Sequence, residues 1–171
     1  ECTTSFQSID ARRFSPDGEF IGERIECSPP EPGWKQTPRL AHNIYRNEYV
    51  VVFSVGSEFG LGEIYVIRTD NVGNILYGPE LVDSGESALL PDIAFNTKTR
   101  EYLVVFNDEN VFNEFMNNAG YMLDEDGVPI KGPFEVGPTF GARYAPDIVY
   151  NPTDDTFLVG WEDFRDADDP V

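Results

Sequence analysis

Short apolar runs alternate with polar turns along this chain in a recurring order. Three runs rich in aromatic and β-branched residues each begin six positions after an asparagine, at residues 49–53, 102–106 and 157–161. A continuous apolar run of this length predicts a strand buried on both faces. Shorter strands are expected before the asparagines, at residues 39–42, 92–95 and 147–150. The polar turns that complete these hairpins occupy residues 43–47, 96–100 and 151–155.

A second kind of hairpin follows the first two of these. Its strands are predicted at residues 63–69 with 75–82, and at 118–123 with 128–136. Aspartate and glycine mark the connecting turns, 70–73 and 124–127, because Asp bonds the turn backbone and Gly supplies a positive φ. Residues 9–21 match this pattern, and Gly18, Gly73 and Gly127 lie 55 and 54 positions apart. The chain therefore begins with a second hairpin and ends with a first one.

These hairpins define a tandem repeat whose spacing is 53 and then 55 residues, with Pro38, Pro91 and Pro146 ahead of the first strands. A repeat of about 40–50 residues built from strands predicts a propeller. We expect an all-β fold with β-propeller-type four-stranded blades. The chain supplies three blades' worth of strands, arranged as a half-blade, two whole blades and a second half-blade. The single repeat domain divides into residues 1–37 (a second half-blade and linker), 38–90, 91–145 and 146–171.

The chain resembles the repeats of secreted bacterial β-propeller proteins in three segments, PDIAFN, EYLVVFND and YMLDEDGVPIKGPFEV. Such blades combine an Asn turn, a Leu-Val-Val-Trp strand and an Asp-x-Asp-Gly hairpin. The resemblance covers nearly the whole chain and implies an extracellular or cell-surface propeller. One departure is Arg39, which stands where the other repeats have Asp92 and Asp147.

The two half-blades predict where partners attach. Residues 4–27 and 145–163 could complete one blade, but a closed ring usually needs about four blades. Two chains could form a six-bladed ring, the chain could be a piece of a longer propeller, or copies could assemble open-ended. We therefore expect self-association, or binding of another chain, through the terminal strands within 1–28 and 145–171.

Net charge and the length of the apolar runs exclude two classes of partner, nucleic acids and the membrane interior. The net charge is −19, from 31 acidic and 12 basic residues. Nucleic-acid binding is not expected, because phosphate contacts require clustered Lys and Arg. Membrane insertion is not expected either, because no apolar run approaches the length of a membrane span, about 20 residues.

Cysteine and histidine usage bears on redox state and catalysis. Cys2 and Cys27 are the two cysteines, and His42 is the single histidine. A Cys2–Cys27 disulfide fits a secreted protein, and two free buried thiols are the alternative. No zinc site and no Ser-His-Asp set can be assembled from this inventory. The chain is therefore expected to be non-catalytic, with no certain cofactor.

Acidic and aromatic residues after the buried strands are the candidate ligand-binding groups. Carboxylate oxygens suit Ca²⁺, and the densest acidic cluster is Asp163, Asp166, Asp168 and Asp169. Solvated loop tips are the alternative. Aromatic rings beside acids are typical of glycan or protein interfaces, and the candidates are Trp34, Asp108, Glu109, Phe112, Phe115 and Phe140. Rings that only fill space between blades are the alternative.

These observations predict a non-catalytic extracellular β-propeller module for binding or self-assembly. A carbohydrate-binding or glycan-processing propeller and a Ca²⁺-stabilised surface scaffold are the two alternatives.

Overall fold

The computed structural model describes residues 7–28, 33–56, 62–83, 87–108, 117–137 and 143–164, and over these residues the protein consists of twelve strands without a helix. The strands are β1 (Asp10–Phe14), β2 (Phe20–Glu26), β3 (Trp34–Asn43), β4 (Glu48–Gly56), β5 (Gly62–Thr69), β6 (Ile75–Asp83), β7 (Leu89–Asn96), β8 (Glu101–Asp108), β9 (Asn117–Leu123), β10 (Pro129–Val136), β11 (Arg143–Asn151) and β12 (Thr156–Asp163).

The strands form four antiparallel sheets that follow chain order. Two of the sheets are four-stranded, β3–β4–β5–β6 and β7–β8–β9–β10, and each is a simple meander. The other two sheets contain two strands each, β1–β2 and β11–β12. The predicted all-β class, the twelve strands and their grouping are confirmed. The described residues do not form a closed ring of sheets.

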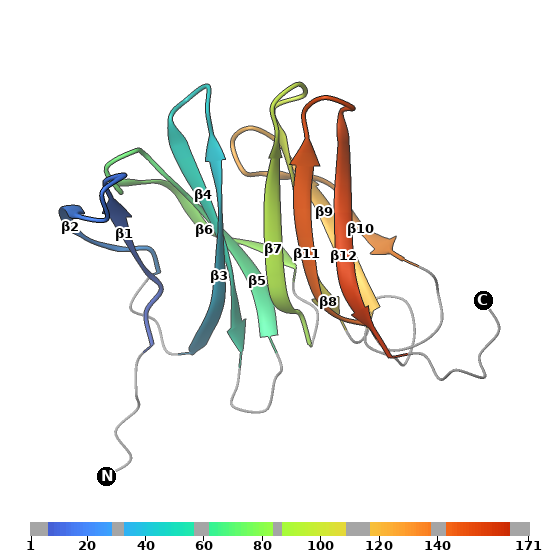
Figure 1. Cartoon of the computed structure of the whole chain (residues 1–171). Helices are drawn as coiled ribbons and strands as arrows, with labels where there is room; N and C mark the ends of the chain where they lie inside the picture. Colours follow the sequence, from blue (N-terminus) through green and yellow to red (C-terminus); the bar gives the residue numbers. More distant parts are fainter. Residues whose placement is uncertain are drawn as a thin grey trace, which may run out of the picture.

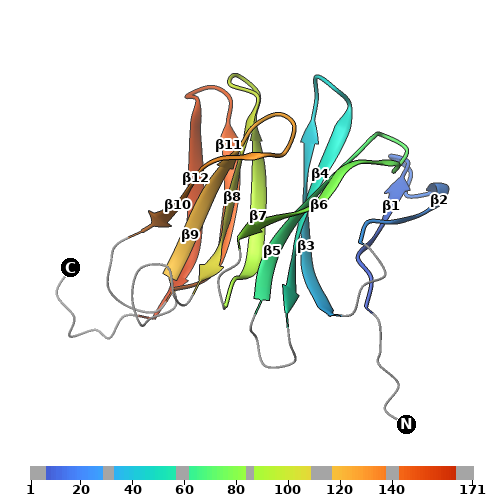
Figure 2. The same ribbon diagram turned by 180° about the vertical axis from the view of Figure 1, so that it is seen from behind.

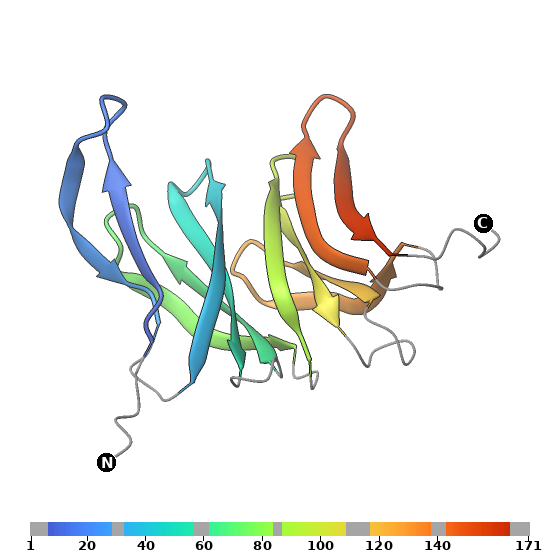
Figure 3. The same cartoon turned by 60° about the horizontal axis from the view of Figure 1, so that its bottom comes forward.

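The sheets stack face to face in the order in which they occur along the chain (Figures 1 and 2). The first strands of three successive sheets, β3, β7 and β11, lie side by side, and the contacts between neighbouring sheets are concentrated on them. Turned to show its underside, the molecule places β1–β2 and β11–β12 at opposite ends (Figure 3).

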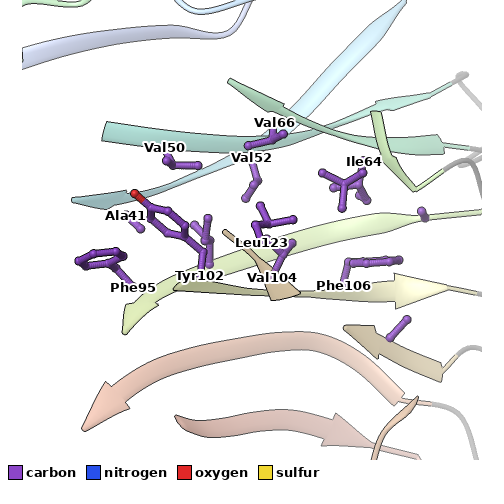
Figure 4. Close-up of a cluster of buried hydrophobic side chains, with 14 residues drawn as sticks. Ala41, Val50, Val52, Ile64, Val66, Phe95, Tyr102, Val104, Phe106 and Leu123 are labelled. Atoms are coloured by element: carbon purple, nitrogen blue, oxygen red, sulfur yellow. The ribbon is translucent and has the colours of Figure 1, made fainter. Parts of the chain in front are cut away.

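Three apolar layers hold the stack together, because burying apolar surface is the main favourable contribution to folding. The central layer lies between the two four-stranded sheets, where Val50, Val52 and Val66 face Tyr102 and Val104 (Figure 4). The other buried members of this layer are Ala41, Ile64, Val82, Ala88, Ile93, Phe95, Phe106, Ala119 and Leu123. A smaller layer covers each outer side: Ile9, Cys27, Val51, Phe53 and Ile67 towards β1–β2, and Ala94, Leu103, Val105 and Ile148 towards β11–β12.

The first hairpins turn through asparagine side chains. The Asn43 Oδ1 atom accepts hydrogen bonds from the backbone N–H groups of Tyr45 and Arg46, at 2.9 and 3.2 Å. Equivalent bonds join Asn96 to Lys98 and Thr99, and Asn151 to Thr153. The last residue of each turn, Asn47, Arg100 or Asp155, has a positive φ of 53° to 62°. The predicted asparagine turns are confirmed.

Aspartate organises the second hairpins. The Asp70 Oδ1 atom accepts three backbone N–H groups, from Val72, Gly73 and Asn74, at 2.7–2.9 Å. Asp124 accepts the N–H groups of Asp126 and Val128 in the same way. The interpretation of 70–73 and 124–127 as hairpin turns is confirmed.

The first strands are longer than predicted. Each continues on both sides of its proline, so β3 begins at Trp34 and not at residue 39. The residue before the proline, Thr37, Leu90 or Ala145, has φ near 50°, and the strand register shifts there. Proline cannot donate to the ladder, and it is accommodated here because each proline lies at a β-bulge in a strand at the edge of its sheet.

Burial of the third apolar run also differs from the prediction. The β4 and β8 strands are buried on both faces, whereas exposed and half-buried residues alternate along β12. The prediction of burial on both faces was wrong for residues 157–161. The physical reason is that no described sheet lies beyond β11–β12 to cover its outer face.

Candidate functional site

The two ends of the stack carry uncovered faces that correspond to buried faces inside it. We call the outer face of β11–β12, with Val149, Leu158 and Gly160, the tail face. Its repeat equivalents on β7–β8 are Ala94, Leu103 and Val105, which are buried against the next sheet. Leu158 is 70% exposed, whereas Leu103 is 7% exposed. The tail face therefore has the composition of an inter-sheet contact but no described sheet against it.

The head face, which we define as Leu40, His42 and Tyr49 on β3–β4, lies at the other end of the stack. Its repeat equivalents are Ile93, Phe95 and Tyr102, which belong to the central apolar layer. In β3–β4 the ring of His42 lies 5.0 Å from that of Tyr49, and Leu40 is 53% exposed. An exposed face of this kind is a candidate contact for another sheet.

A cavity of about 490 Å³ lies between the head face and the β1–β2 sheet. Arg12, Arg13 and Phe14 line it from β1, and Leu40 and Tyr49 line it from β3 and β4. In the two four-stranded sheets, the third strand (β5 or β9) has the first two strands of its own sheet beside it. By repeat position β1 is a third strand, and among the described residues it pairs only with β2.

The inner strands carry one charged residue at each equivalent position: Arg39, Asp92 and Asp147. The buried Asp92 side chain accepts the backbone N–H of Ile148 at 2.8 Å, and its Oδ1 atom lies 3.8 Å from Arg39 Nε. Burial raises the pKa of the Asp92 carboxyl above its ordinary value, and the neighbouring Asp147 carboxylate raises it further. Asp92 thus fastens β11 to β7 by a bond from side chain to backbone.

A charged clamp joins the two four-stranded sheets at their turns. Arg46 contacts Asp126 at 2.6 Å and Glu125 at 3.2 Å, and Arg68 contacts Glu48 at 3.0 Å and Asp126 at 3.1 Å. The hydrogen bond from Arg46 lowers the pKa of Asp126. These residues lie up to 80 positions apart in the sequence, and only their charge could have suggested that they meet. The acids of the 124–127 turn are therefore partners of arginines.

Three of the residues predicted to bind ligands lie in the described part of the chain, on three different strands. Trp34 is exposed at the start of β3, Asp163 is exposed at the end of β12, and Asp108 is buried at the end of β8. The remaining candidates, Glu109, Phe112, Phe115, Phe140, Asp166, Asp168 and Asp169, lie outside the described residues. Within those residues, no three His, Cys, Asp or Glu side chains form a group that could hold a metal ion.

Asp108 lies near groups that were not predicted. The Tyr121 hydroxyl donates a hydrogen bond to Asp83 at 3.0 Å, and burial followed by the charges of Asp83 and Asp108 raises the pKa of Tyr121. Asp83 comes at the end of β6, and no motif in the sequence marks it. The arrangement is a buried polar contact between the two four-stranded sheets.

The predicted disulfide is not seen among the described residues. Cys27 is a free thiol buried beneath β1–β2, and Cys2 lies outside those residues. Burial raises the pKa of the Cys27 thiol, and the charge of Asp10 raises it further. Cys27 packs as an apolar side chain here.

Comparison with known proteins adds no family. No protein-family model matches the chain, and no curated protein has a significantly similar sequence. In the part of the chain that the structure describes, no helix is long and apolar enough to cross a membrane.

Proposed function

We propose that this protein is a non-catalytic, propeller-type interaction module that associates with other protein through its head and tail faces. The observation that carries the proposal is the contrast between Leu158, which is exposed, and its repeat equivalent Leu103, which is buried. The same sequence pattern forms an inter-sheet contact inside the stack and an open surface at its end. A surface built like a core layer is favourable only when something covers it.

Three features of the stack support a propeller-type arrangement. The whole sheets are four-stranded meanders, they pack face to face in chain order, and their first strands lie together. Each of these is typical of blades around an axis. The incomplete sheets at the two ends support association as the role of the module, because unpaired strand edges readily pair with another chain.

The polar residues that cluster in the described parts support a structural role. Asp92 bonds the backbone of the neighbouring sheet, and Arg46 and Arg68 bind acids of the neighbouring sheet. An extracellular location rests on the resemblance to secreted repeat proteins alone, and fractionation of the producing cells would test it.

Sedimentation velocity over a range of protein concentrations tests the association. We expect the mass of the wild-type protein to rise with concentration and Leu158→Lys to stay monomeric, because a charge on the tail face cannot be buried without cost. Ile44→Lys is the matched control, since Ile44 is 57% exposed in the β3–β4 turn outside both faces. A wild-type protein that is monomeric at every concentration would refute the proposed function.

A further inference from the structure

We propose that the tail face of one copy docks on the head face of a second copy, so that β11–β12 of the first and β1–β2 of the second form one four-stranded sheet. The inference rests on the proposed function and names its partner as another copy of this chain. The order of the composite sheet is β11–β12–β1–β2. Within the described residues of one chain, β12 pairs only with β11 and β1 only with β2.

Strand order supports the composite sheet. In both complete sheets the second strand pairs antiparallel with the third, β4 with β5 and β8 with β9. By repeat position β12 is a second strand and β1 is a third strand. The two incomplete sheets therefore supply complementary halves, and their separation at opposite ends of the molecule favours pairing between copies (Figure 3).

The register of the new pairing follows from the two complete sheets. Val52 is opposite Val66 in β4–β5, and Val105 is opposite Gly120 in β8–β9. The equivalent residues in the incomplete sheets are Gly160 and Ala11, aligned through the turn glycines Gly18, Gly73 and Gly127. We therefore place Gly160 of one copy opposite Ala11 of the second.

The same register covers both open faces. Val149 and Leu158 come to lie over Leu40 and Tyr49 of the second copy, in the cavity between the head face and the β1–β2 sheet. Inside the molecule, the equivalent contact places Ala41 and Val50 in one apolar layer with Ile93 and Tyr102. The proposed contact thus repeats a packing arrangement that the protein already contains.

The inner charged residues complement each other across the proposed contact. Asp92 accepts the N–H of Ile148 from the next sheet, so Asp147 is placed to accept the N–H of Leu40 from the second copy. Within one chain, Asp147 lies beside Asp92. In the proposed complex, Arg39 of the second copy lies beside Asp147 in the same way. The opposite charges of Arg39 and Asp147 favour this contact.

Mixing two defective variants tests the head-to-tail contact. Leu158→Lys damages the tail face and Leu40→Lys damages the head face, and each change lies at an exposed position. We expect each variant to be monomeric alone. An equimolar mixture should form a one-to-one complex, because the intact tail face of Leu40→Lys meets the intact head face of Leu158→Lys.

The outcomes separate this inference from the proposed function. If the wild type associates and the mixture stays monomeric, the head-to-tail contact is refuted while association through the faces stands. If Leu40→Lys associates as the wild type does, the head-to-tail contact is also refuted. If the wild type never associates, both proposals fail.

Cysteine cross-linking tests the register. Gly160→Cys is accommodated because no atom lies within 4 Å of an added Cβ there. After oxidation of a mixture of Gly160→Cys and Ala11→Cys chains, peptide mapping should find position 160 linked to position 11. A matched mixture with Arg12→Cys should give less product, because position 12 is one residue away from the position expected opposite 160. Preferential linkage to position 12 would overturn the register.

Discussion

Asp92 and Arg39 occupy equivalent positions in neighbouring repeats. The side chain at this position decides whether the sheet can accept a hydrogen bond from the backbone of the next sheet. A carboxylate at this position bonds the Ile148 N–H of the next sheet, whereas a guanidinium cannot accept a hydrogen bond. Asp92 achieves this while buried beside Asp147, and burial and that charge raise its pKa. The bond is therefore formed at an electrostatic cost.

We expect Asp92→Asn to gain stability relative to the wild type as the pH rises from acid to neutral. The folded protein holds the Asp92 proton more tightly than the unfolded chain, so protonation favours the fold. This contribution is complete below the ordinary Asp pKa and is lost as the pH rises through the raised folded pKa. The amide of the variant retains an oxygen for the Ile148 N–H. Urea unfolding of both proteins over this pH range measures the difference, and a gain confined to acid would contradict the expectation.

The contribution of Asp70 to stability is expected to depend on pH in the opposite direction. The hydrogen bond from the Asn74 side chain, with help from three backbone N–H groups, lowers the pKa of Asp70. Its contribution to stability is therefore complete above the ordinary Asp pKa and is lost as the pH falls through the lowered folded pKa. Asp70→Ala should lower the urea midpoint at neutral pH and matter less in acid. Asp17→Ala, in a turn where Ser15 accepts the Glu19 N–H, is the control and should have little effect.

Residue-level prediction from sequence was good where a side chain bonds its own turn and poor elsewhere. Asn43 and Asp70 act on backbone within four positions, so local sequence carries the information. The contact of Arg46 with Asp126 spans 80 positions, and no local signal encodes it. The positive φ at Leu90 before Pro91 was also missed, because the first strands were expected to begin only after the proline.

At the scale of the element, the apolar strands owe their burial to position in the stack. The β8 and β12 strands have similar apolar sequences, yet only β8 is covered on both sides. Sequence could predict that both are strands of a repeat. It could not predict which one lacks a neighbour, because that depends on how many sheets precede and follow it.

Truncating equivalent leucines measures this difference. We expect Leu103→Ala to cost about 3 kcal/mol of the free energy of unfolding, as is usual for a buried leucine. In dilute protein Leu158→Ala should cost less than about 0.5 kcal/mol, because its side chain is already in water. Chemical denaturation of both variants provides the comparison. Equal losses in dilute protein would contradict the exposure of the tail face.

At the scale of the whole molecule, the stack has unlike ends. Each sheet presents one kind of face to the sheet before it and another to the sheet after it, so an end cannot pair with an identical end by the same contact. A contact of this heterologous kind closes into a ring when the rotation per subunit permits, and otherwise continues without limit. The mass distribution of the wild-type protein therefore also reports the curvature of the stack.

A circular permutant can test the proposed pairing of β12 with β1, because it can carry both hairpins of that sheet in one chain. A chain running from residue 33 to 171 and on through a flexible linker to residues 1–28 would carry all four strands of the β11–β12–β1–β2 sheet in sequence. Circular permutation succeeds in many domains. With Gly160→Cys and Ala11→Cys in one chain, we expect oxidation to link the permutant within a single chain and the natural order between chains, as non-reducing electrophoresis would show. The order of the segments along the polypeptide would then decide whether β12 pairs with β1 of the same chain or of another chain. The side chains at that contact would be the same in the permutant and in the natural order.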